Sequence, residues 1–126
     1  MGDGNISNGY SPEEINFVME NTGLGFCLDV GHCFCAANAL KVEPFEYLNR
    51  FMQLKPDMYH LTDNEFNSPF DKHYHFGQGN YDIERILTVI PEDSLVTIET
   101  NKDFKDNLSD FVKDIEVLKG QSNAIL

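Results

Sequence analysis

Short apolar runs alternate with amphipathic helical segments along most of this 126-residue chain. The apolar runs have the length and composition of buried strands, and they cover residues 25–30, 58–61 and 95–100. Apolar residues at helical spacing mark the segments between and around them, at 11–22, 43–54, 83–90 and 104–118. One helix followed by three strand–helix units predicts an α/β fold with a parallel sheet and right-handed crossovers.

Capping residues mark where the predicted helices begin and end. Ser11 is a predicted N-cap that forms a capping box with Glu14, and Gly23 is predicted to end the first helix. Gly120 is predicted to close the last helix in the same way. Residues 33–40 follow the first strand, and we expect them to form a loop.

The spacing of the strands favours part of a barrel over a small doubly wound sheet. Successive units repeat after about 35–40 residues, as they do in barrels whose βα loops are long. A complete (β/α)8 barrel takes about 250 residues, so this chain is expected to hold about half of one. Three strands cannot close a barrel, and the predicted sheet has open edges.

The barrel portion is expected to extend over residues 11–120. We expect the Gly- and Asn-rich segment 1–10 to be disordered, as a frayed end, a vector remnant or an artificial start, and residues 121–126 to form a tail. Segment 1–10 lacks the basic and apolar parts of a signal peptide. The cysteines are an odd number in a chain without an export signal, which predicts reduced thiols and a cytoplasmic location.

The charge of the chain disfavours two classes of partner. Nine Lys and Arg residues stand against 21 Asp and Glu residues, and the formal net charge is −12. Such a chain repels a nucleic-acid backbone and an anionic membrane surface. No apolar run approaches the roughly 20 residues of a membrane-spanning helix. We therefore expect no membrane partner, and nucleic acid is an unfavoured one.

Acidic and histidine side chains gather where the predicted strands end. The C-terminal ends of parallel strands are where barrel active sites are built. Imidazole and carboxylate together are ligands for Zn²⁺ or Mn²⁺. The sequence therefore predicts a site for a divalent metal ion. The candidate ligands are Asp29, His32, His60, Asp71, His73 and Glu99.

Each of these residues also has a simpler interpretation. Asp29 and His32 fit a turn carboxylate and a surface histidine, and His60 alone fits a hydrogen-bonded core histidine. Asp71 and His73 fit a solvated loop. Glu99 favours a metal more strongly, because a carboxylate at the end of an apolar strand is costly unless it is paired or ligated.

Other polar residues in the same loops receive secondary roles. We expect Asp63 and Asn64 to be hydrogen-bond partners of the ligands, and His75 to be structural. The segment 77–79 has a Gly-x-Gly pattern that fits a phosphate site, but a plain turn leading into a helix is favoured. The cysteines are expected to fill the core, with a Cys33 thiolate beside the site as the alternative.

Four of these segments resemble a known superfamily. LDVGH, MYHLTDN, DKHYHFGQGN and VTIET are similar, in this order, to the last three strands of the xylose-isomerase-like barrels. That superfamily contains sugar and sugar-phosphate isomerases and epimerases, and also the endonuclease IV group of abasic-site nucleases. The resemblance covers residues 11–120 and implies the last three βα units of such a barrel, preceded by one helix.

The resemblance implies different ligand sets in the two branches. In the sugar branch one metal is held by Glu, Asp, His and Glu, and Asp29, His60 and Glu99 match three of these positions, with His32 as a substrate contact. In the nuclease branch three zinc ions are bound, and all six candidate residues are ligands. Both branches take a further Glu from the preceding strand, and the nuclease takes two more His; none of these lies in this chain.

Three hypotheses for function follow from the resemblance. In the first, the metal chelates the oxygens of a sugar or sugar phosphate and stabilises an enediolate, while Glu99 and the missing Glu move the proton. In the second, zinc-activated water attacks a phosphodiester. In the third, a truncated barrel binds metal without activity of its own. Net charge favours the first, and the spacing of Asp71 and His73 favours the second. The implied partners are a small sugar and either a missing N-terminal half-barrel or another copy of the chain.

Overall fold

Three parallel strands form the centre of the part of the chain that the computed structural model describes, residues 11–100 and 109–125. They are β1 (Cys27–Asp29), β2 (Met58–Leu61) and β3 (Leu95–Ile98). Strand β2 pairs with β1 on one side and with β3 on the other. The register places Leu28 beside Tyr59 and Tyr59 beside Val96. The strands therefore follow one another across the sheet in chain order, as the alternating pattern predicts.

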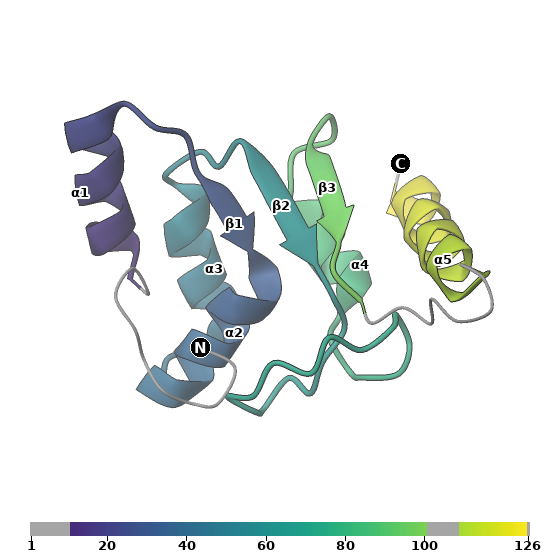
Figure 1. Ribbon diagram of the computed structural model, residues 1–126. Coiled ribbons are helices and arrows are strands. Elements are labelled where there is room, and N and C mark those ends of the chain that lie inside the picture. Colours follow the sequence, from purple (N-terminus) through teal and green to yellow (C-terminus); the bar gives the residue numbers. More distant parts are fainter. Residues whose placement is uncertain (1–10, 101–108, 126) are drawn as a thin grey trace.

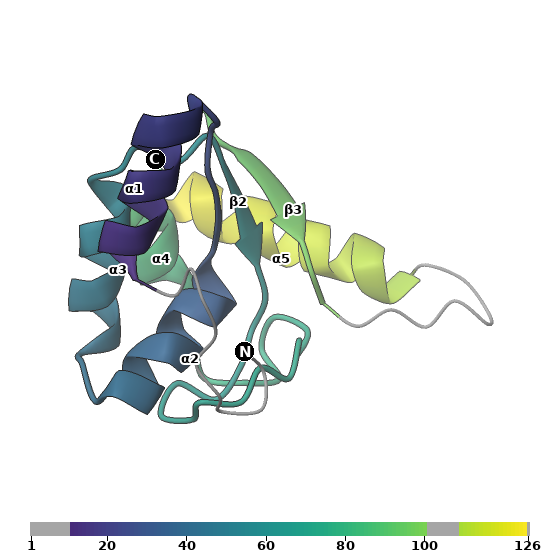
Figure 2. The same ribbon diagram turned by 60° about the vertical axis from the view of Figure 1, so that its left-hand side comes forward.

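Helices follow or precede each strand in the expected order. They are α1 (Pro12–Thr22), α2 (Val30–Leu40), α3 (Pro44–Met52), α4 (Ile83–Val89) and α5 (Ser109–Ile125). Helices α2, α3 and α4 lie on one side of the sheet in both views, and α5 lies beside α4 (Figures 1 and 2). No helix in the described ranges is long and apolar enough to cross a membrane.

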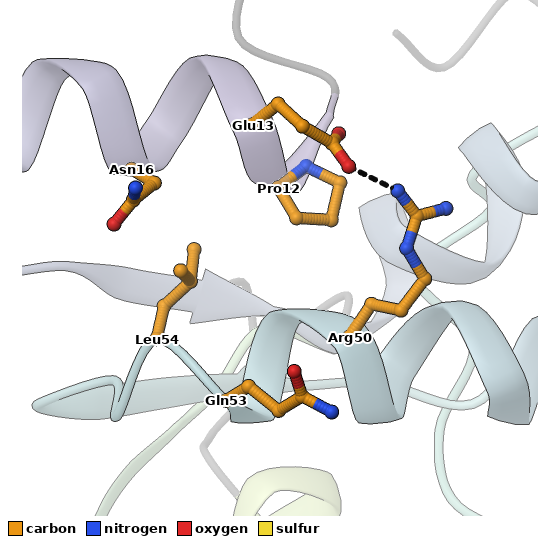
Figure 3. Close-up of a pocket in the computed structure, with 6 residues that line it drawn as sticks. All are labelled: Pro12, Glu13, Asn16, Arg50, Gln53 and Leu54. Carbon is orange, nitrogen blue, oxygen red and sulfur yellow. Dashed lines mark hydrogen bonds and ion pairs between the residues drawn. The ribbon is translucent and has the colours of Figure 1, made fainter.

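The first helix begins and ends as its sequence predicts. The Ser11 hydroxyl accepts a hydrogen bond from the Glu14 N–H at 3.2 Å, and Gly23 ends the helix with a φ of 71°. Helix α1 then faces α3 across a shallow pocket of about 310 Å³ (Figure 3). Within that pocket the Glu13 carboxylate pairs with the Arg50 guanidinium. Both partners are exposed, so this ion pair contributes little to stability.

The segment 33–40 is helical, and the loop predicted there is wrong. It belongs to α2, which begins directly after β1 because the Asp29 carboxylate caps it, accepting from the His32 N–H at 2.9 Å. The apolar side chains of this segment pack into the core, with Phe34 and Ala37 fully buried. The helix ends at Lys41, whose φ of 59° closes it in the left-handed conformation.

The last helix does not end at Gly120 as predicted. Helix α5 continues through this glycine to Ile125, and Gly120 is not among the glycines with positive φ. A glycine inside a helix costs about 1 kcal/mol relative to alanine, which tertiary packing can offset. The predicted tail 121–126 is thus largely helical. The predictions for residues 1–10 and 104–108 lie outside the described residues.

The core lies between the sheet and the helices that cover one of its faces. Alternate strand residues point toward this core, among them Leu28, Tyr59 and Leu61, and each is nearly fully buried. The residues between them point the other way. Cys27 and Thr97 are exposed on that side, and Leu95 is 69% exposed. No helix or strand of the described ranges covers this side of β1, β2 and β3, which we call the open face.

Candidate metal centre

The predicted ligands all lie at the C-terminal end of the sheet. Asp29 is the last residue of β1, His32 lies in the first turn of α2, and His60 lies in β2. Glu99 directly follows β3. Asp71 and His73 come from the long loop between β2 and α4. One edge of the sheet therefore carries every candidate ligand that the sequence suggests.

Two imidazoles and one carboxylate form the tightest group. His32 Nε2 lies 2.8 Å from Asp71 Oδ2, and His73 Nε2 lies 3.0 Å from the same oxygen. The three ligand atoms lie within 4.8 Å of one another, which makes this a group that could hold a metal ion. The Asp71 side chain is only 3% exposed, so its charge is poorly solvated.

The other three candidates form a looser group next to the first. His60 Nδ1 lies 3.3 Å from Glu99 Oε1 and 3.7 Å from Asp29 Oδ2. The same Asp29 oxygen lies 3.7 Å from His32 Nδ1, so Asp29 stands between the two groups. The structure thus brings all six predicted residues into one connected cluster of imidazoles and carboxylates.

The hydrogen bond of His73 suits a metal ligand. Its Nδ1 lies 2.6 Å from the Glu99 backbone oxygen, which only accepts, so Nδ1 carries the proton. His73 Nε2, the other ring nitrogen, is the one that faces Asp71 and could bind a cation. Metal-bound histidines are usually oriented by a hydrogen bond from their other ring nitrogen, for example to a backbone carbonyl. The donor set therefore fits a divalent cation such as Zn²⁺ or Mn²⁺.

Electrostatics hold His32 and Asp71 as an ion pair. The hydrogen bond from Asp71 raises the pKa of His32, although burial opposes the shift, and the Asp29 charge adds to it. Burial alone raises the pKa of Asp71, but the hydrogen bond to His32, the charge of His73 and the bond from Asn64 outweigh it and lower the pKa. A metal ion must therefore displace a proton from His32 to bind here.

Asn64 supports the tight group directly. Its Nδ2 donates to Asp71 Oδ1 at 2.9 Å, and its Oδ1 accepts from the Lys72 N–H at 3.1 Å. Asp63 supports the tight group only indirectly. Its buried carboxylate accepts from the N–H groups of Asn64, Gly77, Gly79 and Tyr81, at 2.8 to 3.2 Å. Asn64 is a hydrogen-bond partner of a candidate ligand, as expected, whereas the Asp63 carboxylate binds backbone N–H groups of the loop and of Asn64. Together the two residues fix the loop that carries Asp71 and His73.

The Gly-x-Gly turn is not arranged for a phosphate. The Gly77 and Gly79 N–H groups already donate to the Asp63 carboxylate. Gly79 also passes so close to the backbone that a Cβ there would lie 2.2 Å from the Asn64 oxygen. The structure supports the plain turn that leads into α4. Glycine is required at position 79 because of this close approach to the Asn64 backbone.

The buried cysteines do not join the site. Burial raises the pKa of the Cys33 thiol far above its usual range and that of Cys35 to about 12. Both side chains pack in the core and remain protonated thiols at neutral pH. The alternative of a Cys33 thiolate ligand therefore finds no support.

One buried acid near the site, Asp114, was not predicted from the sequence. Asp114 of α5 lies 2.6 Å from His75 Nδ1, which accounts for the structural role expected of His75. Its only sequence signal is an acidic residue beside apolar residues of an amphipathic helix, among them Ile115 and Leu118. That signal is weak, because acidic residues are common at the border between the apolar and polar faces of an amphipathic helix.

No protein-family model and no curated protein matches this chain. It is similar to a solved structure described as the crystal structure of D-tagatose 3-epimerase-like protein, with 24% sequence identity and a TM-score of 0.68. The match covers 93% of this chain and 42% of that one, so the chain spans less than half the length of that protein. At this identity the likeness concerns the fold. The chain has the fold of part of a (β/α)8 barrel, as the sequence predicts.

Proposed function

We propose that this chain is the metal-binding part of a barrel enzyme that isomerises or epimerises a small sugar or sugar phosphate. One observation carries the proposal: imidazoles and carboxylates from three neighbouring strands and their loops converge at the C-terminal edge of the sheet. The fold shared with a D-tagatose 3-epimerase-like protein and the net charge of −12 support a small-molecule substrate over a polyanion.

In this proposal Asp29, His60 and Glu99 hold one Zn²⁺ or Mn²⁺ together with a ligand from outside the chain. When bound, such an ion would supply Lewis-acid polarisation of a sugar carbonyl. Glu99 accepts or returns a proton at a carboxylate oxygen, and its side chain is 38% exposed and within reach of a substrate. His32 contacts the substrate from the first turn of α2, where its side chain is 44% exposed.

The chain needs further strands for turnover. In the described residues β1 and β3 each have one edge without a strand partner, and the open face has no covering layer. We propose that an N-terminal half-barrel or a second copy of the chain covers this face. The free thiols of Cys27, Cys33 and Cys35 are consistent with the reducing cytoplasm that we propose as its location.

A second candidate is a zinc-dependent nuclease that acts at abasic sites. It is favoured by the tight group of His32, Asp71 and His73, because a single-metal isomerase does not need these residues as ligands. The acidic balance of the chain opposes it, since a DNA-binding surface needs Lys and Arg. We therefore rank this candidate second.

Metal content and two assays separate the candidates. The chain, alone and joined to the upstream strands of its barrel, is loaded with Zn²⁺ or Mn²⁺, and the bound metal is counted by elemental analysis. We expect about one equivalent per complete barrel, turnover of ketoses and no cleavage of an abasic duplex. Three zinc equivalents with duplex cleavage would replace the first candidate by the second. Absence of bound metal would refute both.

A further inference from the structure

Asp114 is a buried carboxylate outside the cluster of proposed ligands. It lies on α5, and its residue is only 2% exposed. A carboxylate in such a position is costly unless hydrogen bonds compensate for the lost water. Asp114 therefore has to be anchored by specific donors.

Three donors converge on this carboxylate. His75 Nδ1 and Thr100 Oγ1 each donate to Oδ2 at 2.6 Å, and the Phe76 N–H donates to Oδ1 at 3.1 Å. The ionised carboxylate only accepts, so the proton of His75 lies on Nδ1. These bonds come from two different segments, the loop between β2 and α4 and the end of β3.

Both segments carry residues of the candidate metal centre, which are His73 of the tight group and the proposed ligand Glu99. His75 and Phe76 follow His73 closely in the chain, and Thr100 directly follows Glu99. The His73 ring and the Glu99 backbone are themselves joined by a 2.6 Å hydrogen bond. Asp114 thus holds from one side the two segments whose relative position sets the distance between His73 and Glu99.

The backbone at His73 requires such support. Its φ of 52° lies in the left-handed region, which is unfavourable for a residue with a side chain. On its far side Tyr74 is fixed by two backbone hydrogen bonds with Asp63, both at 3.0 Å. Asp114 fixes the next residues, His75 and Phe76. The strained conformation is therefore clamped by the residues that follow it.

We infer that Asp114 is a positioning residue for the metal centre, through which α5 sets the geometry of His73 and Glu99. This inference rests on the proposed metal centre. It predicts that metal affinity depends on a side chain that touches no ligand atom. Loss of a partner that orients ligands typically lowers metal affinity by about 10–100-fold.

The test is a Zn²⁺ titration of the full chain against a competing chelator. Asp114→Ala should lower the Zn²⁺ affinity by about 10–100-fold. Asp114→Asn should retain more, because its amide can keep an acceptor for the Phe76 N–H and the His75 ring can change tautomer. Leu118→Ala is the control, since it removes a side chain of α5 that packs against the core. It should lower the melting temperature and leave the affinity of the folded chain unchanged.

Every other outcome of the titration either overturns the inference or leads to a second variant that tests it. A folded Asp114→Ala variant with wild-type affinity, or an equal loss in Leu118→Ala, would overturn the inference. If Asp114→Ala does not fold, Thr100→Val replaces it, since that variant removes one donor and keeps the shape of the side chain. Wild-type affinity in both Thr100→Val and Asp114→Asn would then overturn it. If the wild-type chain binds no Zn²⁺, the metal centre itself fails, and that result is distinct from the others.

Discussion

His32 and Asp71 meet at 2.8 Å although they come from the first turn of α2 and from the loop that follows β2. The contact joins the capped start of a helix to a loop acid whose side chain is almost fully buried. Asn64 occupies the other oxygen of that acid. The pair therefore holds a proton in the tight group, next to the proposed ligand Asp29.

The first prediction is a dependence on pH in the metal-free chain. The raised pKa of His32 adds stability that is present below its unfolded value of 6.5 and is lost as pH rises through the folded pKa. The lowered pKa of Asp71 adds stability that is present above 3.8 and is lost as pH falls through the folded pKa. The pair should therefore stabilise the fold most at mildly acidic pH.

Thermal melts of the metal-free chain from pH 3 to 9 test this direction of the pH dependence. Asp71→Asn is the comparison. For Zn²⁺ bound at the tight group of His32, Asp71 and His73, the affinity should rise as pH increases through the raised pKa of His32, because metal and proton compete for its imidazole. A wild-type profile parallel to that of Asp71→Asn would contradict the assignment.

The second prediction uses His73 to separate the two candidate functions. In the complete barrel His73→Ala should leave about one metal equivalent bound and weaken ketose turnover mainly through substrate affinity. His60→Ala, the control, should remove that ion, because His60 is a proposed ligand of the single metal. Loss of one equivalent from three in His73→Ala, with collapse of abasic-duplex cleavage, would identify the nuclease instead.

The third prediction concerns the loop that Asp63 organises. Asp63→Ala leaves the N–H groups of Gly77, Gly79 and Tyr81 without their acceptor in a buried position. We expect a loss of about 3–5 kcal/mol in the free energy of unfolding, measured in denaturant. Asp57→Ala is the matched control, since its exposed carboxylate accepts from the Phe26 N–H alone among the bonds described, and about 1 kcal/mol should be lost. Equal losses would mean that Asp63 has no special role.

The fourth prediction is self-association of the isolated chain. The open face and the strand edges expose apolar surface, with Leu95 at 69%. Light scattering should show a mass that grows with concentration, and Leu95→Ser should reduce the effect. Val112→Ser, an exposed position on α5, should not reduce it. A monodisperse monomer that melts cooperatively at high concentration would show that the chain is a complete small domain.

The alternating pattern of the sequence was sufficient for the strands and for most helices. β2 covers the residues predicted for it, and Ser11 and Gly23 cap α1 as expected. Helix α2 was missed because its cap, Asp29, also fits the pattern of a ligand at the end of a strand. In the structure the Asp29 carboxylate caps α2 and lies 3.7 Å from His60 Nδ1. Local patterns do not separate two roles of one residue.

The grouping of the site residues depended on the loop conformation. Spacing alone suggested that Asp71 and His73 lie together, but the contact of both with His32 follows from the path of the loop that Asp63 and Asn64 hold. Asp114 could not be found in this way, because its donors come from segments remote in sequence. Long-range contacts of this kind become visible only when the helix is docked.

The open face also bears on which ion the isolated chain selects. Within the part of the chain that the structure describes, no segment opposes its imidazoles and carboxylates to fix a coordination number or exclude a larger ion. Affinity should then follow the Irving–Williams order, in which copper outcompetes zinc and manganese binds weakest. Selectivity for the metal used in catalysis would then depend on the half of the barrel that faces this one. The isolated chain would bind copper in preference to zinc or manganese.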